Sequence, residues 1–326
     1  MSRVRTKSRK QYVLQNDAAL IAAKLPDAKV AKPPAFIEPC LATLHNKVPS
    51  GEKWVHEIKF DGYRLQLHKH ENDIRAYTRR GFDWTKRFSS LVAAMWRLQV
   101  FDVVLDGEVI VPTETGHSDF GALESDLGSG RSDRFIFYAF DVLYIGSHDL
   151  RRCPLSDRKR VLEELLRGEK GPIVISETLP DGGPALYKQA CKLGLEGIVS
   201  KRLEAPYRSG RAPAWTKITC RMRDTFVVAG VAYKGKKFDG VYLARRSGRT
   251  LRYAGKVEHG FSDASRKKLE EKAAALISLR QPLTPKIRKP KARWLKPELL
   301  ADVEYRALTG DGKLRHPSFK GLREDL

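Results

Sequence analysis

The side chains best suited to covalent chemistry in this sequence lie in the run of residues 57–64. Lys59 follows an apolar stretch, an Asp-Gly turn comes next, and Arg64 opens a second stretch. A lysine becomes a nucleophile when burial or a neighbouring cation keeps its amine neutral near pH 7, and Arg64 is such a cation. Gly62 would let the backbone pass close to a bound ligand. A solvated lysine in a turn is the commoner outcome for so short a pattern.

Further polar residues follow Lys59 in order, each at or near an expected strand. They are Arg79, Glu108 in an Asp-Gly-Glu run, Phe140 in an aromatic stretch, Glu196 and Lys201 at opposite ends of one strand, and Lys217 just after Trp215. Each alone fits an exposed strand end or a core position. As an ordered series of cations and carboxylates they need a common explanation, and they favour a single catalytic site.

A second copy of Lys-Phe-Asp-Gly occurs at residues 237–240, so the four letters alone do not identify the nucleophile. This copy has Tyr242 where the first has Arg64, and no Asp-Gly-Glu run follows it. It lies in a lysine-rich turn, residues 234–237, that could offer charge to a nucleic-acid backbone. Lys59 is therefore the predicted nucleophile.

The composition favours a nucleic-acid partner. The 326 residues include 61 Lys and Arg against 39 Asp and Glu, a net charge of +22. Such an excess implies a polyanionic partner, nucleic acid before an anionic membrane surface. No apolar run approaches the roughly 20 residues that span a bilayer, and no secretory signal is recognisable. The four cysteines form no Cys-x-x-Cys pair, which argues against zinc and against a disulfide framework and predicts a reduced, cytoplasmic protein.

The hydrophobic pattern predicts two domains after a basic, flexible arm at residues 1–33. Strands dominate residues 34–220, with helices between groups of strands, which indicates an α+β domain built on antiparallel sheets. Residues 221–326 contain short strands and one helix, typical of a small barrel of the OB type. The strands expected in the first domain are 54–60, 63–68, 74–78, 101–111, 134–144, 173–175, 197–201 and 215–220; the helices are 84–98, 156–166 and 185–193.

The ordered series resembles the nucleotidyltransferase motifs of the covalent ligase and mRNA-capping superfamily. It is most similar to ATP-dependent DNA ligases of the bacterial end-joining type, over about residues 35–326. The resemblance implies an antiparallel-sheet adenylation domain followed by an OB-fold domain. It also implies that Lys59 takes AMP from ATP as a phosphoramide, passes it to the 5′-phosphate at a nick, and so allows the 3′-hydroxyl to attack.

The resemblance assigns roles to the other members of the series. Arg64 contacts the nucleotide and Arg79 the 5′-phosphate side of the nick. Glu108 and Glu196 bind the ribose or the metal. Glu57 accepts from the adenine amino group and Phe140 stacks on the adenine ring. Lys201 and Lys217 hold the α-phosphate and the leaving pyrophosphate, which Arg323 near the C-terminus orients.

The implied cofactors are ATP and Mg²⁺ or Mn²⁺, and the implied substrate is nicked or broken duplex DNA. We expect a monomer associated with the nucleoid and, from the resemblance, a Ku-like end-binding partner. Two positions depart from the family pattern: Thr219 and Leu326 stand where lysines are usual, which would slow self-adenylation. The alternatives are an RNA ligase, a GTP-using capping enzyme and a degenerate, non-catalytic DNA-binding homologue.

Overall fold

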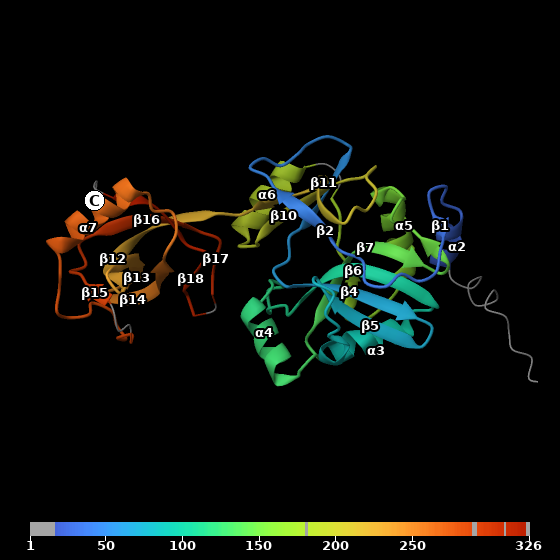
Figure 1. The fold of residues 1–326 in the computed structure, drawn as a ribbon, viewed down its shortest axis with the longest axis horizontal. Helices are drawn as coiled ribbons and strands as arrows, with labels where there is room; N and C mark the ends of the chain where they lie inside the picture. Colours follow the sequence, from blue (N-terminus) through green and yellow to red (C-terminus); the bar gives the residue numbers. More distant parts are fainter. Residues whose placement is uncertain (1–16, 180–181, 289–291, 310, 324–326) are drawn as a thin grey trace, which may run out of the picture. The chain divides into compact units, whose positions relative to one another are not determined.

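The structure is a computed structural model that describes residues 17–179, 182–288, 292–309 and 311–323. The chain divides into two compact units, residues 1–219 and 220–326 (Figure 1). The division falls one residue before the expected boundary. Each unit is described by itself.

The first unit contains a large sheet and a small one. The large sheet has the order β1 (Lys29–Val30), β8 (His148–Asp149), β7 (Ile136–Ile145), β6 (Asp102–Ile110), β4 (Tyr63–His70) and β5 (Asp73–Thr78), and β9 (Ile173–Ile175) pairs with β7. The small sheet has the order β2 (Cys40–Leu44), β11 (Gly210–Thr219), β10 (Gly197–Arg202) and β3 (Trp54–Ile58). Only the β7–β9 and β2–β11 pairs are parallel among the described strands. The predicted α+β class with antiparallel sheets is confirmed.

The two sheets and their helices form successive layers. The helical elements are α2 (Asp17–Ala23), η1 (Thr85–Phe88), α3 (Ser89–Arg97), α4 (Phe120–Ser129), α5 (Leu155–Leu165) and α6 (Gly183–Lys192). Helices α2, α3 and α5 share the main hydrophobic core with one face of the large sheet. A second core joins the opposite face to the small sheet, through residues such as Phe140 and Trp215. Helix α6 packs on the remaining face of the small sheet.

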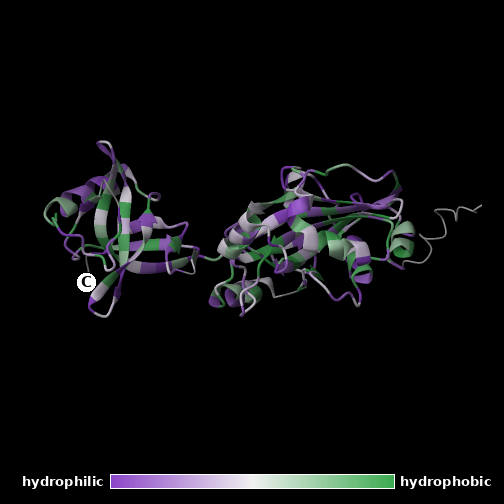
Figure 2. Ribbon diagram, turned by 90° about the horizontal axis from the view of Figure 1, so that it is seen from below, coloured by the Kyte–Doolittle hydropathy of each residue, from purple (hydrophilic) through white to green (hydrophobic). Residues whose placement is uncertain are grey.

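Strand alternation decides which side chains reach the space between the sheets. In β4, Leu65 and Leu67 belong to the main core, so the alternate residues face the small sheet. In β6, Leu105 and Val109 belong to the same core. Figure 2 shows the resulting mixture of hydrophobic and hydrophilic positions along the strands. Polar residues of β4 and β6 are thereby collected on one face.

The second unit is a curved antiparallel sheet with one helix. Its strand order is β14 (Thr250–Val257), β13 (Lys237–Ser247), β12 (Met222–Lys234), β16 (Leu300–Tyr305) and β19 (Ser318–Arg323), and β15 (Ala292–Trp294) pairs with β12. The short strands β17 (Ala307–Leu308) and β18 (Leu314–Arg315) pair with each other, and helix α7 spans Asp263–Ala274. A parallel bridge between His259 and Ser318 brings the chain after β14 against the start of β19. The sheet therefore curls toward closure, as in an OB-fold.

The described structure differs from several sequence expectations. Residues 17–30, expected to belong to the flexible arm, form α2 and β1; Ala18, Ala19 and Ala22 are buried in the main core, because small residues let the helix pack closely on α5. Residues 1–16 lie outside the described part. Strands β2 and β19 and helix α4 were not expected.

The four cysteines are of two kinds. Cys191 and Cys220 are disulfide-bonded, whereas Cys40 and Cys153 are free and buried. This single disulfide was not expected from a sequence that argued against a disulfide framework, since sequence spacing alone does not show which distant cysteines the fold brings together. In the described part of the chain, no helix has the length and apolar character needed to cross a membrane.

Candidate active site

A cavity of about 1000 Å³ in the first unit gathers most of the predicted site residues. Side chains from both sheets line it. The predicted residues among them are Glu57, Lys59, Arg64, Arg79, Glu108, Phe140, Lys201 and Lys217. Glu196 is bonded to Lys59, and Arg323 belongs to the second unit. Nine of the ten predicted positions thus lie in or beside one cavity.

Lys59 lies just past the end of β3 and is tied to the start of β10. Its backbone N–H donates to the carbonyl of Gly197 (2.9 Å), and its Nζ lies 2.5 Å from Glu196 Oε2. Both side chains are mostly buried, with exposed fractions of 20% and 16%. The partner of Lys59 in this state is therefore the carboxylate of Glu196.

Glycines on either side of Lys59 are required by close backbone approaches. A Cβ on Gly62 would lie 2.1 Å from the carbonyl oxygen of Val109. Gly197 has φ +143°, and a Cβ there would lie 2.0 Å from the carbonyl oxygen of Ile218. Gly62 thus lets the chain pass close to β6, and it also lines the cavity, where the sequence predicted a close approach to a ligand.

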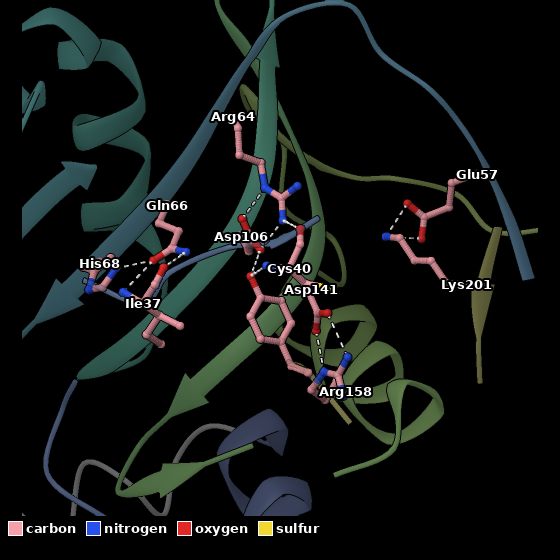
Figure 3. A network of polar contacts seen from close by, with 11 residues as sticks. Ile37, Cys40, Glu57, Arg64, Gln66, His68, Asp106, Asp141, Arg158 and Lys201 are labelled. Atoms are coloured by element: carbon pink, nitrogen blue, oxygen red, sulfur yellow. Dashed lines mark hydrogen bonds and ion pairs between the residues drawn. The ribbon is translucent and has the colours of Figure 1, made fainter. Parts of the chain in front are cut away.

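Arg64 projects from β4 into the space between the sheets. Its Nε and Nη2 donate to the two carboxylate oxygens of Asp106 at 2.7 and 2.6 Å (Figure 3). Although burial opposes the charged form, the carboxylate raises the pKa of Arg64 above its ordinary value. The guanidinium also lies over the ring of Phe140, 4.4 Å from its centroid. A fixed cation therefore stands beside the predicted adenine-stacking residue.

Glu57 is the centre of a buried ion cluster. Its carboxylate accepts from Lys201 Nζ (2.8 and 2.9 Å) and Ser176 Oγ (2.9 Å), and Lys159 Nζ lies 2.7 Å away. Although burial opposes it, the two lysines hold the pKa of Glu57 below its usual range. The expected acceptor of the adenine amino group thus already has three donors.

Lys201 and Phe140 are buried residues that line the cavity. Lys201 is 1% exposed, and its Nζ lies 4.3 Å from the ring centroid of Phe140 and 4.2 Å from that of Trp215. Burial lowers the pKa of Lys201 to about 8, against the attraction of Glu57. Because two cations lie over the Phe140 ring, a base that stacks there must share the ring with one of them or displace it.

Glu108 and Glu196 offer the hard oxygen ligands that a magnesium ion takes. Burial raises the pKa of Glu108 to about 7 despite the opposing charges of Arg64 and Lys59, and the carboxylate of Glu196 acts in the same direction as burial. A divalent cation between two such carboxylates would offset that cost. No cluster of three or more metal-ligating side chains occurs in the described ranges. The donor set therefore fits an ion that keeps several waters or takes phosphate oxygens.

Arg79 stands at the cavity on a tight turn between β5 and η1. Thr78 holds this turn: its carbonyl accepts from Gly81 N–H (2.8 Å), and its hydroxyl accepts from Phe82 N–H (3.2 Å). Gly81 has φ +80°. Arg79 and Arg80 are both exposed, and Phe82 is 60% exposed. The turn thus presents two cations and an aromatic ring to solvent.

The remaining predicted positions have less specific surroundings. Arg323 in β19 donates to Thr225 Oγ1 (3.4 Å) and lies 3.6 Å from Asp302 Oδ1. Thr219 is buried at the end of β11. Leu326 lies outside the described residues. In the second Lys-Phe-Asp-Gly copy, Lys237 is exposed at the β12–β13 turn, and Asp239 is bonded to Lys256 (2.6 Å).

The sequence reasoning missed four residues that support the site. Asp106 and Trp215 each lie two positions before a predicted residue and so share its strand face, a signal present in the sequence. Lys159 lies among the apolar positions of α5, where a basic residue on a buried helix face is unusual. Tyr207, in the loop before β11, shows no such signal.

Comparisons with known proteins agree with this architecture. Residues 37–219 match the ATP dependent DNA ligase domain, and residues 234–326 match the ATP dependent DNA ligase C terminal region. The chain is 39% identical over 303 residues to the multifunctional non-homologous end joining protein LigD of Pseudomonas aeruginosa, covering 90% of this chain and 36% of that protein. It is 32% identical over 295 residues to the SPbeta prophage-derived DNA ligase-like protein LigB of Bacillus subtilis, covering 88% of this chain and 99% of that one.

A solved structure of mycobacterial DNA ligase D, complexed with ATP and MES, resembles the fold. It has a TM-score of 0.54 and 30% sequence identity, and the match covers 88% of this chain and 95% of that chain. The chain spans 36–43% of the length of the LigD relatives from Pseudomonas and the mycobacteria. Since two family models together cover most of its length, the chain belongs to the ATP-dependent DNA ligase family.

Proposed function

We propose that this chain seals nicks or breaks in duplex DNA with ATP, through a covalent lysyl-AMP intermediate on Lys59. The observation that supports this most is the convergence of Lys59 with cations and carboxylates in one cavity of about 1000 Å³. The cavity has room for a nucleotide, and its charged lining suits a triphosphate. Family membership supplies the reaction class.

Each group of residues has a separate task in this proposal. The lone pair of Lys59 Nζ attacks the α-phosphorus, so its contact with Glu196 must be exchanged during attack. Arg64, Lys201 and Lys217 stabilise the charge that develops on the phosphate oxygens. Phe140 and Glu57 hold the adenine, and Arg323 orients the pyrophosphate. Arg79 receives the 5′-phosphate of the nick.

Glu108 and Glu196 are the residues that would hold a Mg²⁺ or Mn²⁺ ion. Such an ion, when bound, neutralises charge on the transferring phosphate and its leaving group. The raised pKa of Glu108 supports this assignment, because a nearby cation would favour its ionised form. The carboxylates thereby become part of the nucleotide site.

We propose double-strand-break repair as the setting, on the strength of the end-joining LigD relatives. The substrate would place the protein in the cytoplasm on the nucleoid, and the partner would be a Ku-like end-binding protein. The chain would act as a monomer. An unchanged rate of end ligation on addition of such a protein would contradict the partnership.

The test is covalent labelling with α-³²P nucleotide and Mg²⁺. We expect a protein adduct with ATP, little with GTP or labelled NAD⁺, and none from Lys59→Ala. Lys237→Ala, at the second copy of the motif, is the matched control and should label like the wild type. The absence of an ATP adduct, or its survival in Lys59→Ala, would refute the mechanism. Sealing of nicked RNA as fast as nicked DNA would instead favour an RNA ligase.

A further inference from the structure

Arg64 belongs to a closed ring of hydrogen bonds whose other side-chain members are Asp106 and Tyr207. The Tyr207 hydroxyl donates to Asp106 Oδ2 (2.6 Å) and accepts from the backbone N–H of Cys40 (2.9 Å). Arg64 Nη2 donates to the same Oδ2 (2.6 Å) and, more weakly, to the carbonyl of Cys40 (3.4 Å). Figure 3 shows Arg64, Asp106 and Cys40 grouped in this way. The ring joins β2, β4, β6 and the loop before β11.

The ring determines which donors of Arg64 remain for a ligand. A guanidinium carries five N–H groups in a rigid planar fork. Nε and Nη2 are bonded to Asp106, and Nη2 also faces Cys40. Among the described residues, Nη1 has no hydrogen-bond partner within the protein, and Arg64 lines the cavity. The orientation of the fork therefore leaves Nη1 for a group bound there.

The Tyr207 hydroxyl is well placed to set that orientation. Asp106 is fully buried and Tyr207 is 5% exposed, so water does not replace the hydroxyl as a donor. Burial and the Asp106 carboxylate raise the pKa of Tyr207 well above its ordinary value, so the phenol stays protonated. Without the Tyr207 hydroxyl, Asp106 Oδ2 would lose this hydrogen bond. The carboxylate of Asp106 could then rotate, and Arg64 would move with it.

Hydrogen bonds to Arg151 and to Arg158 of helix α5 hold the loop that carries Tyr207. Tyr207 N–H donates to the carbonyl of Arg151 (2.8 Å). Arg158 of α5 forms a buried pair with Asp141 (2.7 and 2.9 Å) and donates to the carbonyl of Ala205 (3.3 Å). Figure 3 shows the Asp141–Arg158 pair near the Arg64–Asp106 pair. The hydroxyl is thus held from a rigid support.

We propose that Tyr207 is a positioning residue for nucleotide binding, which acts through Asp106 to aim Arg64 Nη1 at the nucleotide. This inference rests on the proposed function, because it takes the cavity ligand to be ATP. Tyr207 is not among the residues that line the cavity, and its hydroxyl bonds to Asp106 and to Cys40 N–H. Its effect should therefore appear in nucleotide affinity, and only through Arg64.

The test is equilibrium binding of α,β-methylene-ATP, which cannot transfer AMP to Lys59. Tyr207→Phe removes only the hydroxyl. We expect the dissociation constant of the analogue to rise about tenfold, the size expected for loss of a hydrogen bond to a charged group. The matched control is Tyr144→Phe. Tyr144 is also buried, belongs to the same core and donates to the carbonyl of Ala31 (2.8 Å), which is not a member of the ring. It should lower the melting temperature comparably and leave nucleotide affinity unchanged.

A double-mutant cycle separates positioning from general destabilisation. In an Arg64→Ala background, Tyr207→Phe should cause no further loss of affinity. Wild-type affinity in Tyr207→Phe, or an equal loss with and without Arg64, would overturn the inference. Should Tyr207→Phe fail to fold, Asp106→Asn is measured in the same cycle with the same expected outcome. Failure of the proposed function is distinguishable, because then the wild type would bind no analogue or form no ATP adduct.

Discussion

The buried carboxyl group of Glu108 makes the folding stability of the protein depend on pH. It lines the cavity and lies near Arg64, Lys59 and Glu196, yet burial dominates and raises its pKa to about 7. In the unfolded chain the same group titrates near its ordinary value of about 4.5. Between these two values the folded protein holds a proton that the unfolded chain has lost. Folding stability therefore falls as the pH rises through this window.

We predict that the melting temperature of the wild type falls relative to that of Glu108→Gln as the pH is raised from about 5 to about 8. The variant cannot ionise at this position and so lacks the penalty. Melting curves at matched ionic strength, without nucleotide or divalent metal, provide the measurement. Glu163→Gln, an exposed substitution on α5, is the control. A constant difference between wild type and Glu108→Gln across this range would contradict the prediction.

At the scale of the elements, the site depends on how closely the strands approach one another. The turn after Lys59 crosses β6 where only a glycine fits, and the strand that follows Glu196 begins at Gly197 for the same reason. These two approaches fix the backbone on both sides of the Lys59–Glu196 contact. Lys59 is thus placed by strand geometry, and its side chain is mostly buried.

We predict that Gly62→Ala destabilises the protein by about 3 kcal/mol, because the new Cβ forces the turn away from Val109. The shift should also slow lysyl-AMP formation, since Lys59 lies three residues earlier. Gly128→Ala in α4 is the matched control: nothing lies within 4 Å of its Cβ position, and it should be neutral or stabilising by about 0.5 kcal/mol. Denaturant unfolding and single-turnover labelling measure both effects. Equal stability of the two variants would show that the turn can relax freely.

For the whole molecule, charge is the property that a DNA backbone would recognise. The net charge of +22 is spread over both units, and the β12–β13 turn alone carries Lys234, Lys236 and Lys237. Binding through phosphates releases counterions, so affinity falls with salt by a slope of roughly 0.9 per phosphate contact. Contacts to phosphates position a protein on the duplex without reading its bases. The contribution of this turn should therefore be independent of DNA sequence.

We predict that replacing these three lysines by alanine reduces the slope of log affinity against log salt by about 2 to 3. Replacement by arginine keeps the charge and should leave the slope unchanged. Fluorescence anisotropy with a nicked duplex at several salt concentrations measures both variants. An unaltered slope in the alanine variant would remove this turn from the DNA-binding surface. Adenylation with ATP alone should be normal in each.

Much of the site was accessible from the sequence because strand alternation and motif order are local properties. The β pattern placed Glu108 and Lys217 in strands, and the order of the series distinguished Lys59 from Lys237. Partners formed across the fold were not accessible. Nothing near Glu57 in sequence indicates that Lys159 and Ser176 would occupy its carboxylate, since both lie more than a hundred residues away.

Helix α2, within the expected flexible arm, was missed for a different physical reason. The eight lysines and arginines of residues 1–33 favour a solvated segment. A seven-residue helix that buries three alanines leaves little hydrophobic signal against that charge. Helix α4 is comparable: its buried positions are Leu123, Asp126 and Leu127, and Asp126 is bonded to Arg134 (2.6 and 2.9 Å). Local periodicity is weak in both cases, and tertiary packing decides the outcome.

The alternation along β4 and β6 also makes this site convenient to redesign. Positions 64, 66, 106 and 108 can be randomised in a combinatorial library without altering the leucines and valines that alternate with them in the main core. Within such a library, positions 64 and 106 must be varied as a pair, because the two side chains share two hydrogen bonds. Selection for use of an unnatural nucleotide would thus search a small, separable set of positions.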